Sequence, residues 1–552
     1  MGYPRARMAP VRALALVLAG LAVTLALPAT AFGGISEREA ERIADARPEV
    51  ARTEAAHGEL STSVTAEDAS AWRVSYFGDD RELAQVIVER DDGAIREAWT
   101  GHQVAWRMAR GYVGQFGHKL NAPYVWIPLA AIFFCALVDW RRPWRIVHLD
   151  LLVLLSFGIS HVFFNRGEIG LSVPLAYPPL LYLLARMLWI GCRGRWEGLR
   201  PTVPALWLAI AAVFLLAFRI TLNVADSGVI DVGYSGVIGA ERIAHGEPIF
   251  GEGAFPDDDP TGDTYGPTNY YAYVPFELAL PWSGEWDELP AGHAAAIFFD
   301  LATVAGLFVL GRRLRRGPRG EPTRAGTELG TVLAFAWLAY PYTAFALQSN
   351  SNDSLVAALL VWALVGFASP LARGVALGLA AMTKFAPLAL APLFAAGERG
   401  LLARPAWRPA FAFTAAFTAA VALMLAHPAI DPGLATFWDR TLGSQLDRAS
   451  PFSVWGQGPA LDWLQAVVWF GVAALAILVA FVPRERSLAQ VAALTVAVLI
   501  ASQLAVDHWF YLYIPWFAGL LFAALGVSQV RAPGSGGSTP RARPHAPRRL
   551  RR

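Results

Sequence analysis

The chain has 552 residues, of which 55% are hydrophobic and only 16% are charged. Soluble domains carry about 25% charged residues, so this composition excludes an ordinary soluble protein. The formal net charge of +2 is uninformative, because basic and acidic residues are segregated into different loops, and we expect no nucleic-acid partner.

Apolar runs of about 17–25 residues recur along the chain, and each is long enough to cross a bilayer as a helix. We therefore predict an all-α polytopic membrane protein with about 11–12 spans and one broken or re-entrant segment. The run 329–347 is interpreted as one span. The segment 374–396 is interpreted as broken around Lys384 and Pro387, because a full span there would invert every later loop.

The first apolar run ends in Ala29-Thr30-Ala31 after an arginine-bearing start. This pattern is typical of a signal peptide over residues 1–31, either removed or retained as an anchor.

Residues 32–121 are polar and predict a small external α+β domain. A helix over 36–46 is expected to open with a capping box between Ser36 and Glu39. Alternating residues over 71–77 and 83–101 predict paired strands, with a turn at 91–93. This order of elements is similar to the small PepSY-type domains of bacterial envelopes; a packing domain without a ligand is the alternative.

Loop charge predicts the orientation, since Lys and Arg favour the cytoplasmic side of short loops. Residues 223–291 hold thirteen acids and one arginine, and we expect them to face outward together with 427–460. The basic segments expected inside are 140–145, 193–200, 312–320, 484–487 and an arginine-rich disordered tail over 531–552.

Four stretches carry a family resemblance. They are "ADSGVIDVGYSGVIGAERIAHGEPIFG" (225–251), "GDTYGPTNYYAYVPFE" (262–277), "WLAYPYTAFALQSNSNDSLVAALLVW" (337–362) and "GLAAMTKFAPLALAPLF" (378–394). In this order they resemble glycosyltransferases of the GT-C fold, in particular glycosyltransferase family 87 and its polyprenol-phosphate-sugar-dependent relatives. The resemblance implies a GT-C-like catalytic module over 204–530. Residues 122–203 are then additional transmembrane helices.

The resemblance also implies a catalytic base soon after the first span of this module. Asp231 and Asp226 both follow that span, and both are alternatively helix anchors favoured by the helix dipole. We choose Asp231, because it has the better spacing to the "HGEPIF" turn (245–250), where His245-Gly246 should end the helix. The neighbouring acids 257–259 are interpreted as a solvated turn before Pro260 rather than a metal site.

Lys384 is the candidate for the donor phosphate. The sequence holds only two lysines, Lys119 and Lys384, among 46 basic residues. An ionisable group inside an apolar segment is a functional hypothesis by default, and an ammonium suits a phosphate. A lysine that snorkels at a helix break is the alternative.

The remaining candidates are polar or aromatic residues expected near the outer interface, where aromatic side chains suit both a membrane belt and sugar contacts. Asn350, Asn352 and Asp353 could alternatively cap a helix, and His508 could belong to the belt. Arg219 is expected either to snorkel or to bind a lipid phosphate. The substrate-binding candidates are Asp263, Tyr265, Tyr270, Tyr271, Asn350, Asn352, Asp353, Lys384 and His508.

We therefore expect a multi-pass plasma-membrane enzyme whose active site faces outward. It would transfer a mannose- or arabinose-like sugar from a polyprenyl-phosphate donor to a glycan or glycolipid acceptor, by single displacement with a carboxylate base. No cofactor is assigned, and a divalent metal is left open. The alternatives are a polytopic transporter, which should show internal repeats, and an envelope assembly or sensor protein.

Overall fold

The computed structural model describes residues 34–78, 81–112, 114–193, 196–256, 259–285, 289–401, 407–446 and 450–527. The chain forms two compact units, residues 1–110 and residues 111–552. The predicted segment 1–31, the tail 531–552 and the acids Asp257 and Asp258 lie outside the described residues.

The first unit is a small α+β domain. Helices α2 (Glu37–Asp45) and α3 (Pro48–His57) precede an antiparallel sheet of β1 (Ser61–Ala66), β2 (Ala71–Gly78), β3 (Arg81–Glu89) and β4 (Ile95–Thr100), in the order β1-β2-β3-β4. Ala40 and Ala44 of α2 pack against Val74 and Val86 of the sheet. The short helices α4 (His102–Ala105) and η1 (Arg107–Ala109) end the unit.

The predicted helix 36–46 and the strands after residue 70 are present in this unit, but the capping box is not. Ser36 is the N-cap residue, yet its side chain makes no capping hydrogen bond. Helix α3 and strand β1 were not predicted. Strand β1 is exposed along most of its length and therefore shows no hydrophobic alternation in the sequence.

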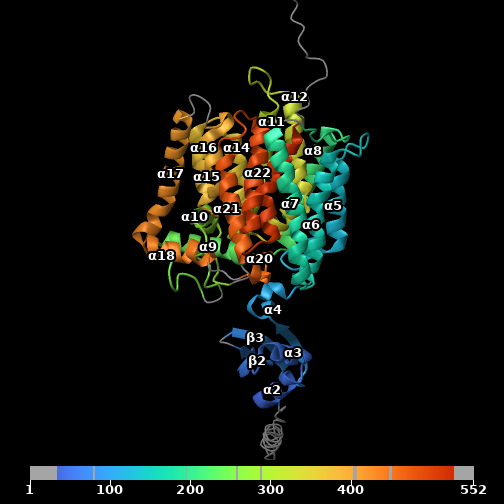
Figure 1. The fold of residues 1–552 in the computed structure, drawn as a ribbon, viewed down its shortest axis with the longest axis vertical. Coiled ribbons are helices and arrows are strands. Elements are labelled where there is room, and N and C mark those ends of the chain that lie inside the picture. Colours follow the sequence, from blue (N-terminus) through green and yellow to red (C-terminus); the bar gives the residue numbers. More distant parts are fainter. Residues whose placement is uncertain are drawn as a thin grey trace, which may run out of the picture. The chain divides into compact units, whose positions relative to one another are not determined.

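The second unit is helical (Figure 1). Its elements up to the middle of the chain are η2 (His118–Asn121), α5 (Pro123–Leu137), α6 (Ile146–Asn165), α7 (Ile169–Arg193), α8 (Ala205–Asp226), α9 (Asp231–His245), α10 (Pro267–Ala279), α11 (Pro290–Leu314), α12 (Arg324–Ala339) and α13 (Pro341–Gln348). The later elements are α14 (Asp353–Val365), α15 (Pro370–Ala381), η3 (Ala386–Leu390), α16 (Ala391–Ala396), η4 (Gly397–Arg399), α17 (Trp407–Ile430), α18 (Leu434–Trp438), η5 (Asp439–Gly443), α19 (Ser444–Leu446), α20 (Val454–Gln457), η6 (Pro459–Leu461), α21 (Asp462–Leu478), α22 (Leu488–Ala505), η7 (Tyr511–Tyr513) and α23 (Ile514–Gly526).

The predicted class, an all-α polytopic membrane protein, is confirmed. Among the described residues six helices are long and apolar enough to cross a membrane, or seven when the bent pair α12–α13 is taken as one span. Five further apolar helices are shorter. The prediction of about 11–12 spans counted these shorter helices as full spans, since composition alone does not reveal where a helix ends.

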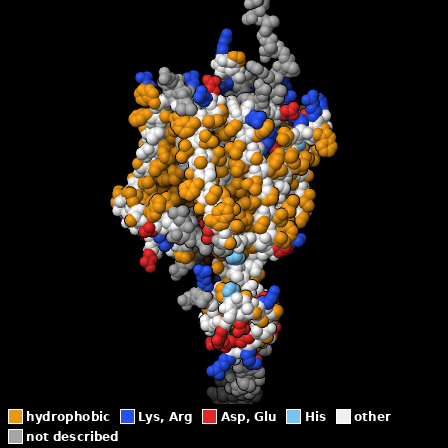
Figure 2. Space-filling model, in the orientation of Figure 1, with side chains coloured by type: hydrophobic (Ala, Val, Ile, Leu, Met, Phe, Trp, Pro, Cys, Tyr) orange, Lys and Arg blue, Asp and Glu red, His pale blue; other side chains and the backbone are white. Residues whose placement is uncertain are grey.

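Charged and apolar surfaces separate along this unit. Figure 2 shows hydrophobic side chains over its flank, with charged side chains gathered toward its two ends. Helices α9 and α18 lie at one end, and the connection between α11 and α12 lies at the other (Figure 1). The described residues of 223–291 and 427–446 therefore lie at one end of the bundle, away from the basic loop 312–320.

The predicted span 329–347 is not one straight helix, because α12 and α13 are bent by 59° at Tyr340-Pro341, as in a broken span or a re-entrant segment. A proline lacks the backbone N–H and clashes with the preceding turn, which breaks the helix. Arg219 from α8 satisfies the carbonyls freed at this bend. Its Nη1 donates to the carbonyl oxygens of Trp337 (3.0 Å) and Leu338 (3.2 Å).

A second break lies where the sequence predicted one, around Lys384. Helix α15 ends at Ala381, and the chain resumes helical geometry only at η3, which begins at Ala386. Lys384 lies in the turn between them.

The additional helices α5, α6 and α7 pack directly against the rest of the unit. The Tyr340 hydroxyl donates to the Leu154 carbonyl of α6 (2.9 Å). His161 of α6 stacks on Tyr511, with ring centroids 4.5 Å apart. These helices therefore form part of one bundle with α12, α13 and η7.

Candidate active site

Helix α9 starts five residues after α8 ends, and hydrogen bonds from Asn350 hold the turn between them. The Asn350 side chain donates to the Ser227 hydroxyl and to the Gly228 carbonyl, each at 2.9 Å, and accepts from Asn223 at 2.8 Å. Asn350 itself has a left-handed backbone, with φ of 49°. Asn350 therefore fixes where α9 begins rather than offering a free side chain to a sugar.

One face of α9 packs tightly on α10. A Cβ on Gly236 would lie 2.7 Å from the Tyr273 ring, and one on Gly239 would lie 2.2 Å from the Tyr270 ring. Only glycine permits so close an approach of ring and helix backbone. The helix ends as predicted, with Gly246 in the left-handed region at φ 73°.

Two carboxylates lie beside the first turns of α9: Asp231, which begins the helix, and Asp259 in the loop before α10. Asp231 is exposed in the first turn, and one turn later the Ser235 hydroxyl lies 2.9 Å from Asp259 Oδ2. Thr261 donates to the other oxygen of Asp259 at 3.2 Å. Burial raises the pKa of Asp259 above its ordinary value, and the negative charges of Asp231 and Asp263 add to this effect. An exposed acid of α9 and a buried acid of the following loop thus lie near each other, and we call Asp231 and Asp259 the carboxylate pair.

The interpretation of residues 257–259 as a solvated turn is wrong for Asp259, which is only 7% exposed. The sequence contains no signal that separates Asp259 from the two acids before it. Its burial depends on Ser235, which lies 24 residues earlier in the chain.

Asp226 lies in a different environment from Asp231. Its carboxylate forms an ion pair with Lys119 at 3.0 Å and accepts the Lys119 backbone N–H at 3.0 Å. The residue therefore joins the end of α8 to η2. Of the two base candidates, Asp226 has a cationic partner and Asp231 lies near a second carboxylate, Asp259.

Asp263 is fully buried and engaged with Arg440, which the sequence analysis did not single out. Arg440 donates to both carboxylate oxygens, at 2.6 and 2.9 Å, and the Gly251 N–H donates to one of them at 3.0 Å. This charge-assisted, two-pronged pairing ties the loop after α9 to η5.

The three candidate tyrosines have different surroundings. Tyr270 is buried, and its hydroxyl donates to the Gly262 carbonyl at 2.8 Å. The Tyr271 hydroxyl lies 3.3 Å from His427 Nδ1 of α17. Tyr265 donates its backbone N–H to the Tyr270 hydroxyl at 3.3 Å, and its ring centroid lies 5.7 Å from Lys384 Nζ.

Lys384 is enclosed by aromatic rings and paired with a buried acid. Its Nζ lies 2.8 Å from Asp353 Oδ1, and the Trp516 indole N–H donates to the same oxygen at 2.7 Å. The rings of Tyr513 and Trp516 lie 5.3 Å from Nζ, within cation–π range. Asp353 is fully buried, whereas the Lys384 side chain keeps 11% exposure.

Buried polar atoms without a partner among the described residues concentrate beside this ion pair. Asn352 donates to Asn269 at 2.7 Å. Buried polar groups without a hydrogen-bond partner are uncommon in folded proteins. Where they occur, they are expected mainly at functional sites. The unpaired atoms of this group are Thr268 Oγ1, Asn269 Nδ2, Tyr273 Oη, Gln348 Oε1 and Nε2, Asn352 Oδ1, Asp353 Oδ2 and Ser354 Oγ.

His508 lies at the edge of the same region. Its Nδ1 is 2.9 Å from the Ser450 hydroxyl, and its ring centroid is 6.5 Å from that of Tyr513. Arg219, in contrast, lies inside the bundle. It is 1% exposed and paired with Asp300 at 2.7 Å, so the interpretation of Arg219 as a phosphate ligand or a snorkelling residue is wrong.

The structure thus forms two groups of candidates, joined by the loop 349–353. The first group is Asp231 with Asp259. The second is Lys384 with Asp353 and Tyr265. The Ile230 N–H at the start of α9 donates to the Ser349 carbonyl at 3.1 Å, and Asp353 follows four residues later. Four residues span at most roughly 14 Å, so both groups belong to one region. In the described part of the chain, no three His, Cys, Asp or Glu side chains converge as metal ligands.

Taken together, the fold and these buried charges define a polytopic helical membrane protein with a polar centre at one end of its bundle. Residues 264–506 match the model of glycosyltransferase family 87. The match indicates a membrane glycosyltransferase, which uses a sugar donor and an acceptor. No curated protein matches the chain.

The matched segment bears out the family resemblance for residues 264–506. It includes Tyr265, the loop 349–353 and Lys384, whereas Asp231, Asp263 and His508 lie outside it. The resemblance of residues 32–121 to PepSY-type domains stays a prediction.

Proposed function

We propose that the protein transfers a mannose- or arabinose-like sugar from a polyprenyl-phosphate donor to a glycan or glycolipid acceptor on the outer face of the cell membrane. The observation that carries this proposal is the position of the carboxylate pair. Helix α9, which bears Asp231, packs through glycines on α10, and α10 lies at the start of the segment matched by the family model.

Asp231 is the proposed base. Its carboxylate takes the proton of the acceptor hydroxyl as that oxygen bonds to the anomeric carbon of the sugar. The bond from the anomeric carbon to the phosphate oxygen breaks, and its electron pair leaves with the polyprenyl phosphate. This single displacement inverts the anomeric configuration. Burial, and to a smaller extent the charge of Asp231, raises the pKa of Asp259 beside the proposed base.

Lys384 is the proposed partner of the leaving phosphate. An ammonium has three donors, of which Asp353 accepts from one, so others can reach phosphate oxygens. The aromatic rings around Lys384 keep water away from the charge and thereby strengthen its interaction with a phosphate. Asp353 acts as a positioning residue, because it holds Nζ without contacting the sugar.

Replacing Lys384 by Met is expected to weaken binding of a polyprenyl-phosphate sugar by about 10- to 100-fold, the equivalent of one charge-assisted hydrogen bond. Donor affinity is measured on protein in lipid nanodiscs. Lys119→Met is the matched control, since it removes the other lysine from an exposed surface pair. The double variant Lys384→Met/Asp353→Asn removes both charges of the ion pair and so leaves no buried carboxylate without its cation. If donor affinity is unchanged in both the single and the double variant, Lys384 does not bind the donor phosphate.

The outward orientation is tested by cysteine labelling in intact cells. Cys135 and Cys192 are first replaced by Ser, because both are exposed. A membrane-impermeant maleimide is expected to label Glu252→Cys, in the acidic loop, and not Arg319→Cys, in the basic loop; both side chains are exposed. Labelling of the second variant alone would place the carboxylate pair on the cytoplasmic side and contradict the proposed orientation.

A further inference from the structure

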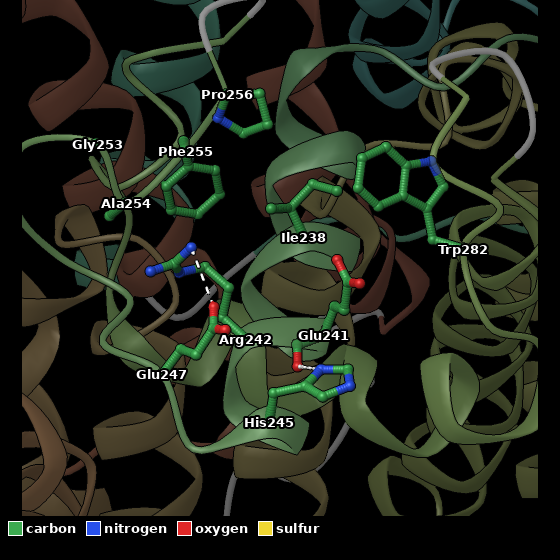
Figure 3. A pocket seen from close by; sticks show the side chains of 10 residues that line it. All are labelled: Ile238, Glu241, Arg242, His245, Glu247, Gly253, Ala254, Phe255, Pro256 and Trp282. Atoms are coloured by element: carbon green, nitrogen blue, oxygen red, sulfur yellow. Dashed lines mark hydrogen bonds and ion pairs between the residues drawn. The ribbon is translucent and has the colours of Figure 1, made fainter.

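A pocket of about 470 Å³ opens along the second half of α9 (Figure 3). Its volume lies within the range of about 300–1,000 Å³ typical of small-molecule sites. Its lining comprises Ile238, Glu241, Arg242, His245, Glu247, Gly253, Ala254, Phe255, Pro256 and Trp282.

The pocket continues the face of α9 that carries Asp231. Ile238, Arg242 and His245 follow Asp231 at intervals of 7, 11 and 14 residues, which brings them to the same side of an α-helix. The rise of 1.5 Å per residue puts Ile238 about 10 Å along the axis from Asp231. A ligand of two or three linked rings in the pocket can therefore extend toward Asp231.

Two aromatic side chains border the pocket. Figure 3 shows Phe255 and Trp282 on either side, with Ile238 and Glu241 between them. The Trp282 backbone N–H donates to Glu277 Oε1 at 2.7 Å, and its indole N–H donates to the Glu285 carbonyl at 2.8 Å. Both polar groups of Trp282 are thus used to hold the residue, which leaves the ring face for contact with the apolar C–H face of a sugar.

The charges in the pocket do not suit an anion. Arg242 is engaged, because its Nε donates to the Pro248 carbonyl at 2.7 Å and its Nη1 pairs with Glu247 at 3.3 Å. The half-buried Glu241 carboxylate has no partner among the described residues, and His245 lies against the Glu241 carbonyl at 2.9 Å. A carboxylate in this position accepts hydrogen bonds from hydroxyl groups and repels phosphate or uronate.

We infer that this pocket binds the neutral saccharide part of the acceptor, with Trp282 as stacking platform and Glu241 as acceptor of its hydroxyl hydrogen bonds. The identity of the bound sugar as acceptor rests on the proposed transferase function, whereas the presence of a saccharide site does not. The lipid-linked donor is assigned elsewhere, since its phosphate needs an available cation.

The inference is tested by saturation-transfer NMR on the full chain in lipid nanodiscs. The neutral probes are maltose and α-1,2-mannobiose, and the anionic probe is digalacturonate. We expect transfer to at least one neutral probe and none to digalacturonate. Trp282→Leu should abolish the signal, and Glu241→Gln should weaken binding about tenfold. Glu285→Gln, an exposed neighbour outside the lining, should bind as wild type.

The result that overturns the inference is an unchanged signal in both Glu241→Gln and Trp282→Leu, preferential binding of digalacturonate, or no binding of either neutral probe. Thermal unfolding of each variant checks that it is folded. If Trp282→Leu does not fold, Glu241→Gln, which keeps the shape of the site, decides the test. Asp231→Asn should bind the neutral probes normally. If the wild-type protein binds the neutral probes but transfers no sugar, the proposed function fails and the saccharide pocket stands. If it binds no neutral probe, the pocket assignment fails whatever the transfer result.

Discussion

Replacing Asp231 by Asn is expected to lower sugar transfer by about 10²–10⁴-fold, the usual contribution of a general base. Asn keeps the size of the side chain and its hydrogen bond to the Val232 N–H (2.8 Å), but cannot take the proton of the acceptor. Donor binding should survive, because the phosphate is assigned to Lys384. The measurement is the initial rate of transfer with saturating donor, together with donor affinity.

Asp226→Asn is the matched control for this experiment. It removes an equivalent carboxylate five residues earlier, which is already paired with Lys119 on the surface. Exposed pairs contribute about 0–1 kcal/mol, so transfer should stay close to wild type. If Asp226→Asn abolishes transfer while Asp231→Asn does not, the assigned base is wrong and the family assignment of residues 264–506 is unaffected.

Arg219→Met is expected to destabilise the folded protein by about 3–5 kcal/mol, the cost of removing one partner of a buried ion pair. The change leaves Asp300 charged and 1% exposed, with the Trp337 indole N–H (2.8 Å) as its remaining partner among the described residues. It also frees the carbonyls of Trp337 and Leu338 at the bend between α12 and α13. Unfolding free energy in mixed micelles measures the effect.

Arg324→Met provides the comparison within the same helix region. Arg324 pairs with Glu328 four residues later at 2.9 Å, with side chains 93% and 47% exposed. Helix pairs of this kind are worth about 0.3–0.5 kcal/mol. Equal unfolding free energies for Arg219→Met and Arg324→Met would contradict a structural role for the buried pair at the bend.

The fold class follows from composition, because runs of apolar residues have few stable alternatives to membrane helices. The break around Lys384 was also predictable, since only an interrupted segment keeps the basic loops on one side. The bend at Pro341 was missed, although its proline is visible, because proline is tolerated in membrane helices when neighbours satisfy the freed carbonyls. That neighbour is Arg219, which lies more than 100 residues earlier.

In the candidate site, too, contacts between residues far apart in the sequence could not be predicted. The sequence drew attention to Lys384 and Asp353 separately, but their 2.8 Å ion pair depends on how α14 meets the turn after α15. The contact of Asp263, a substrate-binding candidate, with Arg440 could not be predicted either, because Arg440 lies 177 residues away. Such pairs leave no periodic pattern in one dimension, since periodicity reports the face of a single helix and not its partner.

The proposed reaction is the transfer of a sugar from a polyprenyl phosphate to an acceptor. The direct measurement is release of polyprenyl phosphate by the purified protein in lipid vesicles, from mannosyl and arabinosyl polyprenyl phosphates and from nucleotide sugars, with disaccharide and glycolipid acceptors. We expect acceptor-dependent release from a polyprenyl-phosphate sugar, no transfer from nucleotide sugars, and loss of release in Asp231→Asn. Transfer from nucleotide sugars alone, or release that is unchanged in Asp231→Asn and Asp226→Asn, would contradict the account.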